Sequence, residues 1–251
     1  SLNLTTKELN VITLVYNEIN TFFPSLKVIL TNYFDCFGDN LATVLELPVH
    51  TLHLDLVRCP SQLDDILESG KLKDNVKLSL GIVDGRNIWK NDFKKSLELI
   101  QKATDALGHD RILIAPSCSL IHSPCDLDLE TNDAVLTPEI KQWLAFAKQK
   151  LDEIVLLQNL ALEEISQVDS VSFLQNTLAN ENRKTSKLIH NEEVKYRVAS
   201  IKCGDDQREN AFNIRRKKQI EALQLPLFPT TTIGSFPQTN EVRSWRAKFK
   251  K

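Results

Sequence analysis

The stretch KLSLGIVDGRN at residues 77–87 decides the fold prediction, because a buried β-strand and the polar turn that ends it are both visible there. Residues 77–83 are largely apolar, as expected for a strand that is covered on both faces. The next four residues, 84–87, are polar or turn-forming. Apolar residues then recur at helical spacing from about 91 to 107, so we predict a strand followed by a helix.

This strand–helix unit recurs along the first half of the chain. Strands are predicted at 27–34, 51–57, 77–83 and 111–115, and a helical pattern follows each of them. Alternation at this spacing predicts parallel β/α units. A (β/α)₈ barrel and a doubly wound open sheet both fit it, and periodicity alone does not separate them. In either fold the carboxyl ends of the strands carry the ligand-binding residues.

Helices flank these units. Thr5 and Glu8 form a capping signal for a helix that Pro24 ends. Thr137 and Pro138 begin another helix, whose apolar residues recur as far as Val155, and we predict that it is continuous. From about residue 165 the strand pattern stops, and helices with loops are expected until a β-branched run at 230–233 begins a new strand.

Composition excludes several classes of function. The net charge of −2 gives no reason to expect binding to nucleic acid or to an anionic membrane. No apolar run is long enough for a membrane helix, and no secretory signal is present at the start. Five irregularly spaced cysteines predict free thiols in a reducing, cytoplasmic compartment. The absence of methionine, even at position 1, leads us to expect an internal segment of a longer protein.

Four motifs resemble those of the cobalamin-independent methionine synthase family, and they occur in the family's order. They are HLDLVR (53–58), GIVDGRNIW (81–89), APSCSL (115–120) and LFPTTTIGSFPQT (227–239). The resemblance implies two (β/α)₈ barrels of the TIM type in the complete enzyme. Residues 1–160 would be the second half of the N-terminal barrel, 161–224 a helical linker, and 225–251 the first strand and start of the catalytic barrel.

The resemblance also implies a function. The family transfers a methyl group from 5-methyltetrahydrofolate polyglutamate to homocysteine and so makes methionine. A zinc ion in its second barrel binds the homocysteine sulfur as thiolate, which suits a thiol that is mostly protonated at neutral pH. The small-molecule substrates would be the only partners, in a monomeric enzyme. The zinc ligands, the catalytic acid and the folate contacts would lie outside these 251 residues, so we expect no catalytic or metal-binding residue here and no activity from this segment alone.

Two groups of residues are candidate binding sites. Ile233, Gly234 and Ser235 match the family segment that holds the amino-acid part of homocysteine or methionine, where glycine permits close approach and Ser235 offers a hydroxyl. Asp84, Arg86 and Asn87 are possible ligand-loop residues at a strand end, and Arg86 could hold a carboxylate. For the second group a structural turn, with Asp84 and Arg86 paired and Trp89 packed, is favoured over the binding role.

Other residues have a functional and a structural interpretation, and the structural one is favoured in each case. Cys118, His122 and Cys125 could bind a metal, but their spacing is not that of a standard zinc pair. Asp55 with Arg58 could line a site or support a turn. His53 lies on an apolar strand and is expected to be a hydrogen-bonded core residue. For the whole chain, the alternatives are a non-catalytic remnant or half-barrel, and a different β/α-barrel enzyme.

Overall fold

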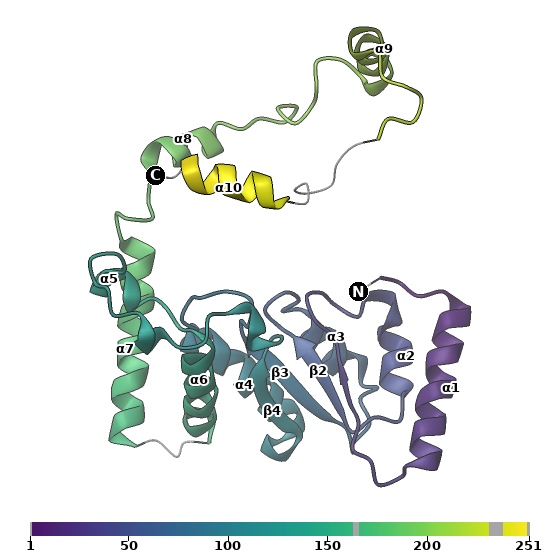
Figure 1. The fold of residues 1–251 in the computed structure, drawn as a ribbon. Helices are drawn as coiled ribbons and strands as arrows, with labels where there is room; N and C mark the ends of the chain where they lie inside the picture. Colours follow the sequence, from purple (N-terminus) through teal and green to yellow (C-terminus); the bar gives the residue numbers. More distant parts are fainter. Residues whose placement is uncertain (1, 163–165, 231–237, 250–251) are drawn as a thin grey trace. The chain divides into compact units, whose positions relative to one another are not determined.

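The computed structural model describes residues 2–162, 166–230 and 238–249, in two compact units, Ser1–His190 and Asn191–Lys251 (Figure 1). The first unit contains a parallel β-sheet with its helices. Its elements are α1 (Thr6–Phe22), β1 (Ile29–Thr31), α2 (Leu41–Glu46), β2 (Thr51–Asp55), α3 (Gln62–Ser69), β3 (Lys77–Val83), α4 (Phe93–Leu107), β4 (Ile112–Pro116), α5 (Pro138–Lys141), α6 (Ala147–Ala161) and α7 (Gln167–Thr185).

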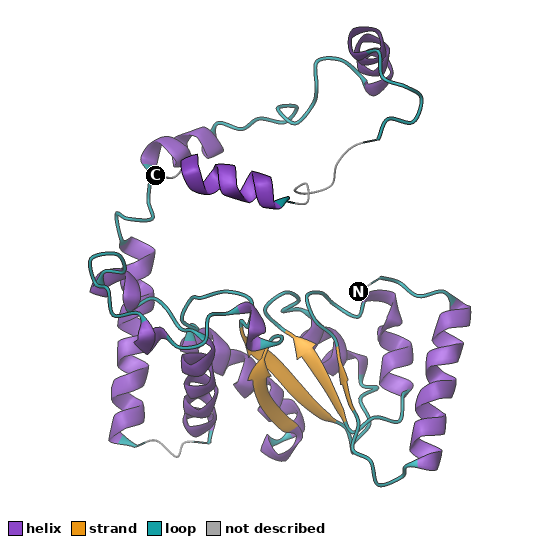
Figure 2. Ribbon diagram, in the orientation of Figure 1, coloured by secondary structure: helices purple, strands orange, loops and turns teal. Residues whose placement is uncertain are grey.

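The four strands are parallel and lie in the order β1-β2-β3-β4 (Figure 2). The sheet is therefore wound in one direction, without the reversal of strand order that marks a doubly wound fold. The register aligns Thr31 with His53 and His53 with Ser79 on one face. It aligns Leu30 with Leu52 and Leu52 with Leu78 on the other face.

The hydrophobic core lies on the leucine-bearing face. Leu52, Leu54, Leu78 and Leu80 are each at most 1% exposed. They pack in one cluster with apolar residues of the covering helices, including Leu63, Ile66, Ile100 and Leu157. Burial of that much apolar surface is the main force that holds the sheet and the helices together. The prediction of an α/β fold with a parallel sheet is thus confirmed.

Strand positions agree with the predictions, although the ends of β1, β2 and β4 differ. The prediction for β3 is confirmed at both ends. The predicted strand at 27–34 is shorter in the structure, because pairing stops at Thr31. Beyond it, the Phe34 N–H donates to the Asp55 carboxylate at 2.8 Å, and Phe34 adopts a left-handed backbone with φ 67°. A tertiary hydrogen bond thus turns the chain away from the sheet.

The prediction of one continuous helix from Thr137 to Val155 is wrong. Only Pro138–Lys141 is helical before a break, and α6 begins at Ala147. Between them, Leu144 forms an antiparallel bridge with Trp89, and Ala145 N–H donates to Ile88 O at 2.9 Å. Residues 143–146 are also buried. Backbone pairing and burial there replace the helical hydrogen bonds that local periodicity favours.

The prediction of five free thiols is wrong for two cysteines. Cys36, after β1, and Cys59, after β2, are joined in a disulfide. Cys118, Cys125 and Cys203 are free. The two bonded residues are 23 positions apart, so their meeting depends on the parallel pairing of β1 with β2 and is not visible in the cysteine spacing.

The second unit contains α8 (Glu192–Ala199), α9 (Phe212–Leu223) and α10 (Asn240–Phe249). None of these three helices has a buried residue. The strand predicted at 230–233 falls almost entirely outside the described residues. In the part of the chain that the structure describes, no helix has the length and apolar character needed to cross a membrane.

Candidate functional site

Loops from all four strands meet at the carboxyl edge of the sheet, and Phe34 connects them. The Phe34 N–H bonds to Asp55 of β2. The Arg86 guanidinium, from the loop after β3, lies 4.5 Å from the centre of the Phe34 ring. His122, from the loop after β4, meets the same ring edge-on with centroids 6.1 Å apart. The structure therefore brings together residues that are up to 88 positions apart in the sequence, from Phe34 to His122.

Asp55 supports these loops. Its carboxylate is 2% exposed and accepts hydrogen bonds from the backbone of Phe34, Val57 at 3.1 Å and Arg58 at 3.0 Å. A buried carboxylate is tolerated when several N–H groups satisfy it. Arg58 contributes its backbone to this arrangement, which agrees with the structural interpretation of Asp55 and Arg58.

The segment from Asp84 to Asn87 forms a hydrogen-bonded turn. Asp84 accepts a bond from Arg86 N–H at 2.8 Å and one from the Asn87 side-chain amide at 2.7 Å. Asn87 in turn accepts a bond from Trp89 N–H at 3.0 Å. Asp84 therefore binds the Arg86 backbone, not its guanidinium, which differs from the side-chain pair expected from the sequence. The exposed guanidinium remains over Phe34, where it can offer N–H groups to an anion.

Two glycines allow close packing at this edge. A Cβ on Gly85 would lie 2.7 Å from Cys118 O, in the loop after β4. A Cβ on Gly81 would lie 2.6 Å from Leu54 O in the neighbouring strand. Since real Cβ atoms do not approach backbone oxygens so closely, both positions require glycine for space.

Lys150 and Glu153 of α6 support the loop after β3 through hydrogen bonds. The sequence analysis did not identify either residue. The Lys150 ammonium is fully buried and donates to Trp89 O at 3.0 Å and to Asn87 Oδ1 at 3.3 Å. Glu153 Oε1 accepts from Asn91 N–H at 2.9 Å. A signal did exist, since both residues fall at helical spacing from Phe146 and Leu157 on the apolar side of the helix.

Burial changes the protonation of this pair. It raises the pKa of Glu153 to about 7, although Asn91 N–H, Lys150 and Lys90 oppose the shift. It also lowers the pKa of Lys150, against the attraction of Glu153, Asp84 and Cys118. Desolvation therefore outweighs charge pairing at both residues, as is usual when ionisable groups leave water.

His53 lies on the open face of the sheet beside a hollow of about 390 Å³ that Tyr33, Ser79 and Cys118 also line. Its ring nitrogens contact Ser79 Oγ at 2.9 Å and Ser117 O at 3.3 Å. Burial lowers the pKa of His53, so the imidazole is neutral near pH 7. The prediction that His53 is buried and hydrogen-bonded is confirmed, although the residue lies on the face of the sheet opposite the hydrophobic core.

The described residues do not fit a zinc site. Cys118 is buried against Gly85, His122 packs on Phe34, and Cys125 is exposed. No group of three or more His, Cys, Asp or Glu side chains within 2–162, 166–230 and 238–249 is arranged to hold a metal ion.

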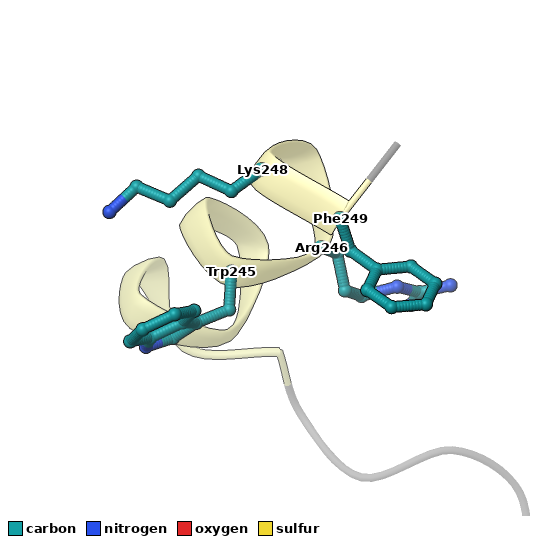
Figure 3. A pocket seen from close by; sticks show the side chains of 4 residues that line it. All are labelled: Trp245, Arg246, Lys248 and Phe249. Atoms are coloured by element: carbon teal, nitrogen blue, oxygen red, sulfur yellow. The ribbon is translucent and has the colours of Figure 1, made fainter. Parts of the chain in front are cut away.

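The second candidate site, Ile233, Gly234 and Ser235, lies outside the described residues. Near it in sequence, α10 borders a hollow, and the described residues that line it are Trp245, Arg246, Lys248 and Phe249 (Figure 3). All four belong to one helix, and Phe249 is 95% exposed. With no described second element to enclose a ligand, this hollow does not qualify as a site.

The sheet and its polar carboxyl edge define a parallel α/β protein, and comparisons identify its relatives. Residues 1–108 match the family model "Cobalamin-independent synthase, N-terminal domain", and residues 228–251 match "Cobalamin-independent synthase, Catalytic domain". A 5-methyltetrahydropteroyltriglutamate–homocysteine methyltransferase of Flavobacterium johnsoniae is 74% identical over all of this chain. Proteins with the same name from Cytophaga hutchinsonii and Caulobacter vibrioides are 54% and 42% identical, again over all of it.

This chain belongs to the cobalamin-independent methionine synthase family. It spans about a third of the length of these relatives, 32% in each of the three. Among solved structures, a putative vitamin-B12 independent methionine synthase of Listeria monocytogenes aligns with 66% of this chain and 44% of its own. The TM-score of that alignment is 0.43, at 10% sequence identity.

Proposed function

We propose that this chain is part of a methyltransferase that moves a methyl group from 5-methyltetrahydrofolate polyglutamate to homocysteine. The observation that carries the proposal is the 74% identity, along the entire chain, to a relative named for that reaction. Identity at that level over 251 residues implies a shared fold. Because the chain spans 32% of that relative, we expect no turnover from it alone.

We further propose that the sheet is half of a (β/α)₈ barrel, with the domain boundaries predicted from the sequence. The sequential order β1-β2-β3-β4, without a reversal, supports this. So does the row of Thr31, His53 and Ser79 on the face opposite the hydrophobic core, since the inner face of a closed barrel is filled by side chains from successive strands. The helical stretch 167–185 packs against α4 through Asn176, which accepts from Phe93 N–H at 3.3 Å.

Within that enzyme, Arg86 would bind a carboxylate of a substrate. Its guanidinium is exposed, is oriented by the Phe34 ring and projects from the carboxyl edge. The hydrogen bonds among Asp84, Asn87 and Trp89 would keep the loop in one conformation, which reduces the entropy lost on binding. Ile233, Gly234 and Ser235 would hold the amino-acid end of homocysteine.

Zinc would be bound by residues outside this segment, because the described cysteines and histidines here do not converge. The enzyme would act on small molecules as a cytoplasmic monomer.

A chimaera tests the proposal. The matching third of the Flavobacterium johnsoniae methyltransferase is replaced by this chain, and methionine formation from homocysteine and the methyl-folate triglutamate is measured. We expect activity within about tenfold of the parent, since that corresponds to only about 1.4 kcal/mol of lost transition-state stabilisation. A folded but inactive chimaera would contradict the proposal.

Variants of that chimaera test the residues. Arg86→Ala should raise KM for the folate substrate or homocysteine while leaving kcat nearly unchanged, because the loss affects binding of the ground state and transition state alike. Arg58→Ala is the matched control, since Arg58 contributes its backbone N–H to Asp55. Equal effects of the two variants would argue against a specific role for Arg86.

The alternative is a non-catalytic half-barrel. The described parts of β1 and β4 each pair with only one strand, which leaves two open sheet edges. The chain in isolation is therefore expected to be of marginal stability or to self-associate.

A further inference from the structure

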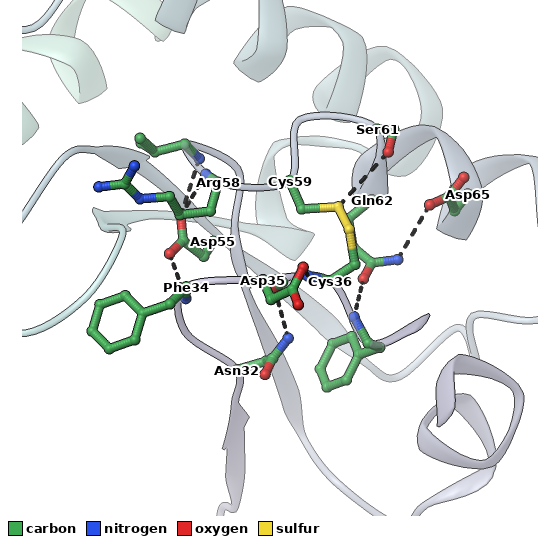
Figure 4. The surroundings of a disulfide bond; sticks show 12 residues. Asn32, Phe34, Asp35, Cys36, Asp55, Arg58, Cys59, Ser61, Gln62 and Asp65 are labelled. Carbon is green, nitrogen blue, oxygen red and sulfur yellow. Dashed lines mark hydrogen bonds between the residues drawn. A yellow bond between two sulfur atoms is a disulfide. The ribbon is translucent and has the colours of Figure 1, made fainter. Parts of the chain in front are cut away.

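We propose that the Cys36–Cys59 disulfide is a site of reversible thiol–disulfide exchange with low-molecular-weight thiols, and that Cys36 is the sulfur attacked. The pair joins the loops that follow β1 and β2, beside Phe34 and Asp55 (Figure 4). The inference stands independently of the methyl-transfer proposal, since it concerns only the sulfurs and their surroundings.

The two sulfurs differ in access. Cys36 is partly exposed in a loop whose neighbours Phe34 and Asp35 are exposed, whereas Cys59 is 4% exposed. An incoming thiolate must approach a sulfur directly, so access decides which one it attacks. Cys36 is therefore the accessible electrophile and Cys59 the leaving group.

The surroundings of Cys59 suit a departing thiolate. It lies just before the N-terminus of α3, where the positive end of the helix dipole favours negative charge. Ser61 Oγ lies 3.7 Å from Cys59 Sγ, within reach to donate to a thiolate. Asp64 and Asp65 in the first turn oppose this in part, although Asp64 is paired with Lys102 and Asp65 accepts from Gln62.

The exchange takes two successive thiolate attacks. The external thiolate attacks Cys36 Sγ, forms a mixed disulfide and releases Cys59 as thiolate. A second thiolate attacks the external sulfur of that mixed disulfide, releases Cys36 as thiolate and leaves the oxidised external disulfide. Two electrons pass from the two external thiols to the protein, and the protein thiolates take up protons from water.

Other contacts keep the sulfurs together after reduction, which makes the exchange reversible. Phe37 N–H donates to Gln62 Oε1 at 2.6 Å, and Phe34 N–H donates to Asp55 Oδ2 at 2.8 Å. These bonds lie on either side of Cys36 and tie its loop to the same segment that carries Cys59 (Figure 4). The opened pair is therefore poised to reoxidise without refolding, and reduction loosens the loop that presents Phe34 to Arg86.

The test uses the full chain with Cys125→Ser and Cys203→Ser, which removes the exposed free cysteines and leaves buried Cys118 as an internal reference. The protein is equilibrated in buffers of reduced and oxidised glutathione, quenched with acid, alkylated and mapped by peptide mass spectrometry. We expect the pair to convert fully and reversibly between disulfide and two thiols without denaturant. Hydrogen exchange of amides 33–37 should quicken on reduction.

Single variants identify the attacked sulfur. In the Cys59→Ser variant, oxidised glutathione should modify Cys36. In the Cys36→Ser variant, oxidised glutathione should modify Cys59 at least tenfold more slowly than it modifies Cys36 in the first variant. If either variant fails to fold, rapid acid quenching of the parent protein gives the same answer from the position of the mixed disulfide. Equal rates, a mixed disulfide on Cys59, reduction only in denaturant, or two persistent thiols in oxidising buffer would each overturn the proposal.

Discussion

At the scale of single residues, the loops at the carboxyl edge of the sheet are held by close backbone packing at one residue and by a buried ionisable group at another. Gly85 shows the role of space, because its Cα lies against the backbone of Cys118. Glu153 shows the role of charge, because one carboxylate oxygen is bonded to Asn91 N–H and the other has no partner among the described residues. Each leads to a prediction that a single substitution tests.

Gly85→Ala should destabilise the first unit. The new methyl group would meet Cys118 O at 2.7 Å, so the loops after β3 and β4 must separate. Overpacking of this kind costs about 1–3 kcal/mol in the free energy of unfolding. Chemical denaturation measures it, with Arg86→Ala as the exposed neighbouring control. Unchanged stability would mean that the two loops do not approach closely.

Glu153 should make stability depend on pH. Its pKa is raised from 4.5 to about 7, so the folded state holds a proton that the unfolded state loses. The contribution is fully present below pH 4.5 and is lost as pH rises through about 7. Its size is at most about 3 kcal/mol.

The measurement for Glu153 is the unfolding free energy from pH 5 to 8. Glu153→Gln should flatten the decline relative to the parent chain, whereas Glu98→Gln, at an exposed position of α4, should leave it in place. Parallel pH profiles for the parent and Glu153→Gln would refute the assignment.

At the scale of elements, the main feature is the interruption between α5 and α6. Residues 143–146 pair with the loop before α4, and this places Lys150 one turn into α6, directly behind Asn87 and Trp89. The element thus supports the candidate loop through backbone and side-chain hydrogen bonds.

Lys150→Met should destabilise the loop, even though methionine matches the apolar surroundings. The change removes the Lys150 donor from Trp89 O and one of the two donors from Asn87 Oδ1, and it removes one of the two cations that oppose the pKa shift of Glu153. Unsatisfied buried groups cost about 1–3 kcal/mol each. Hydrogen exchange of amides 84–91 reports the loosening, and Lys148→Met, exposed on the same helix, should have a smaller effect. Equal exchange in both variants would count against Lys150 as a support.

At this scale, features that depend on residues close together in the sequence were predicted correctly, whereas features that depend on distant residues were not. The sequence was sufficient for the Thr5–Glu8 capping box and the limits of β3, since those depend on neighbouring residues and on burial of an apolar run. It was not sufficient for the end of β1 or the break at 142–146, where Asp55 and Ile88 supply hydrogen-bond partners from distant positions.

At the scale of the whole molecule, the open edges of the sheet determine whether the chain self-associates in solution. Strand β1 pairs only with β2 among the described residues, and Ile29 on it is 56% exposed. An unpaired apolar edge recruits other strands.

The isolated chain should therefore self-associate as its concentration rises, as measured by sedimentation velocity. Ile29→Lys should reduce the association, because a charge on an edge strand opposes pairing. Ile121→Lys is the control, since Ile121 is 84% exposed in the short 3-10 helix that follows β4 and belongs to no strand. A monomer at every concentration would rule out the edge as an association site.

The sequence by itself determined the β/α units, the family and the burial of His53, because apolar periodicity and contiguous motifs are local properties of the chain. Only the tertiary structure decided that Cys36 meets Cys59, that Phe34 joins Asp55, Arg86 and His122, and that Lys150 and Glu153 are buried behind the loop. These contacts join loops and helices distant in sequence. Parallel strands bring their carboxyl ends to one edge, and which side chains meet there depends on strand register and loop path, neither of which local sequence specifies.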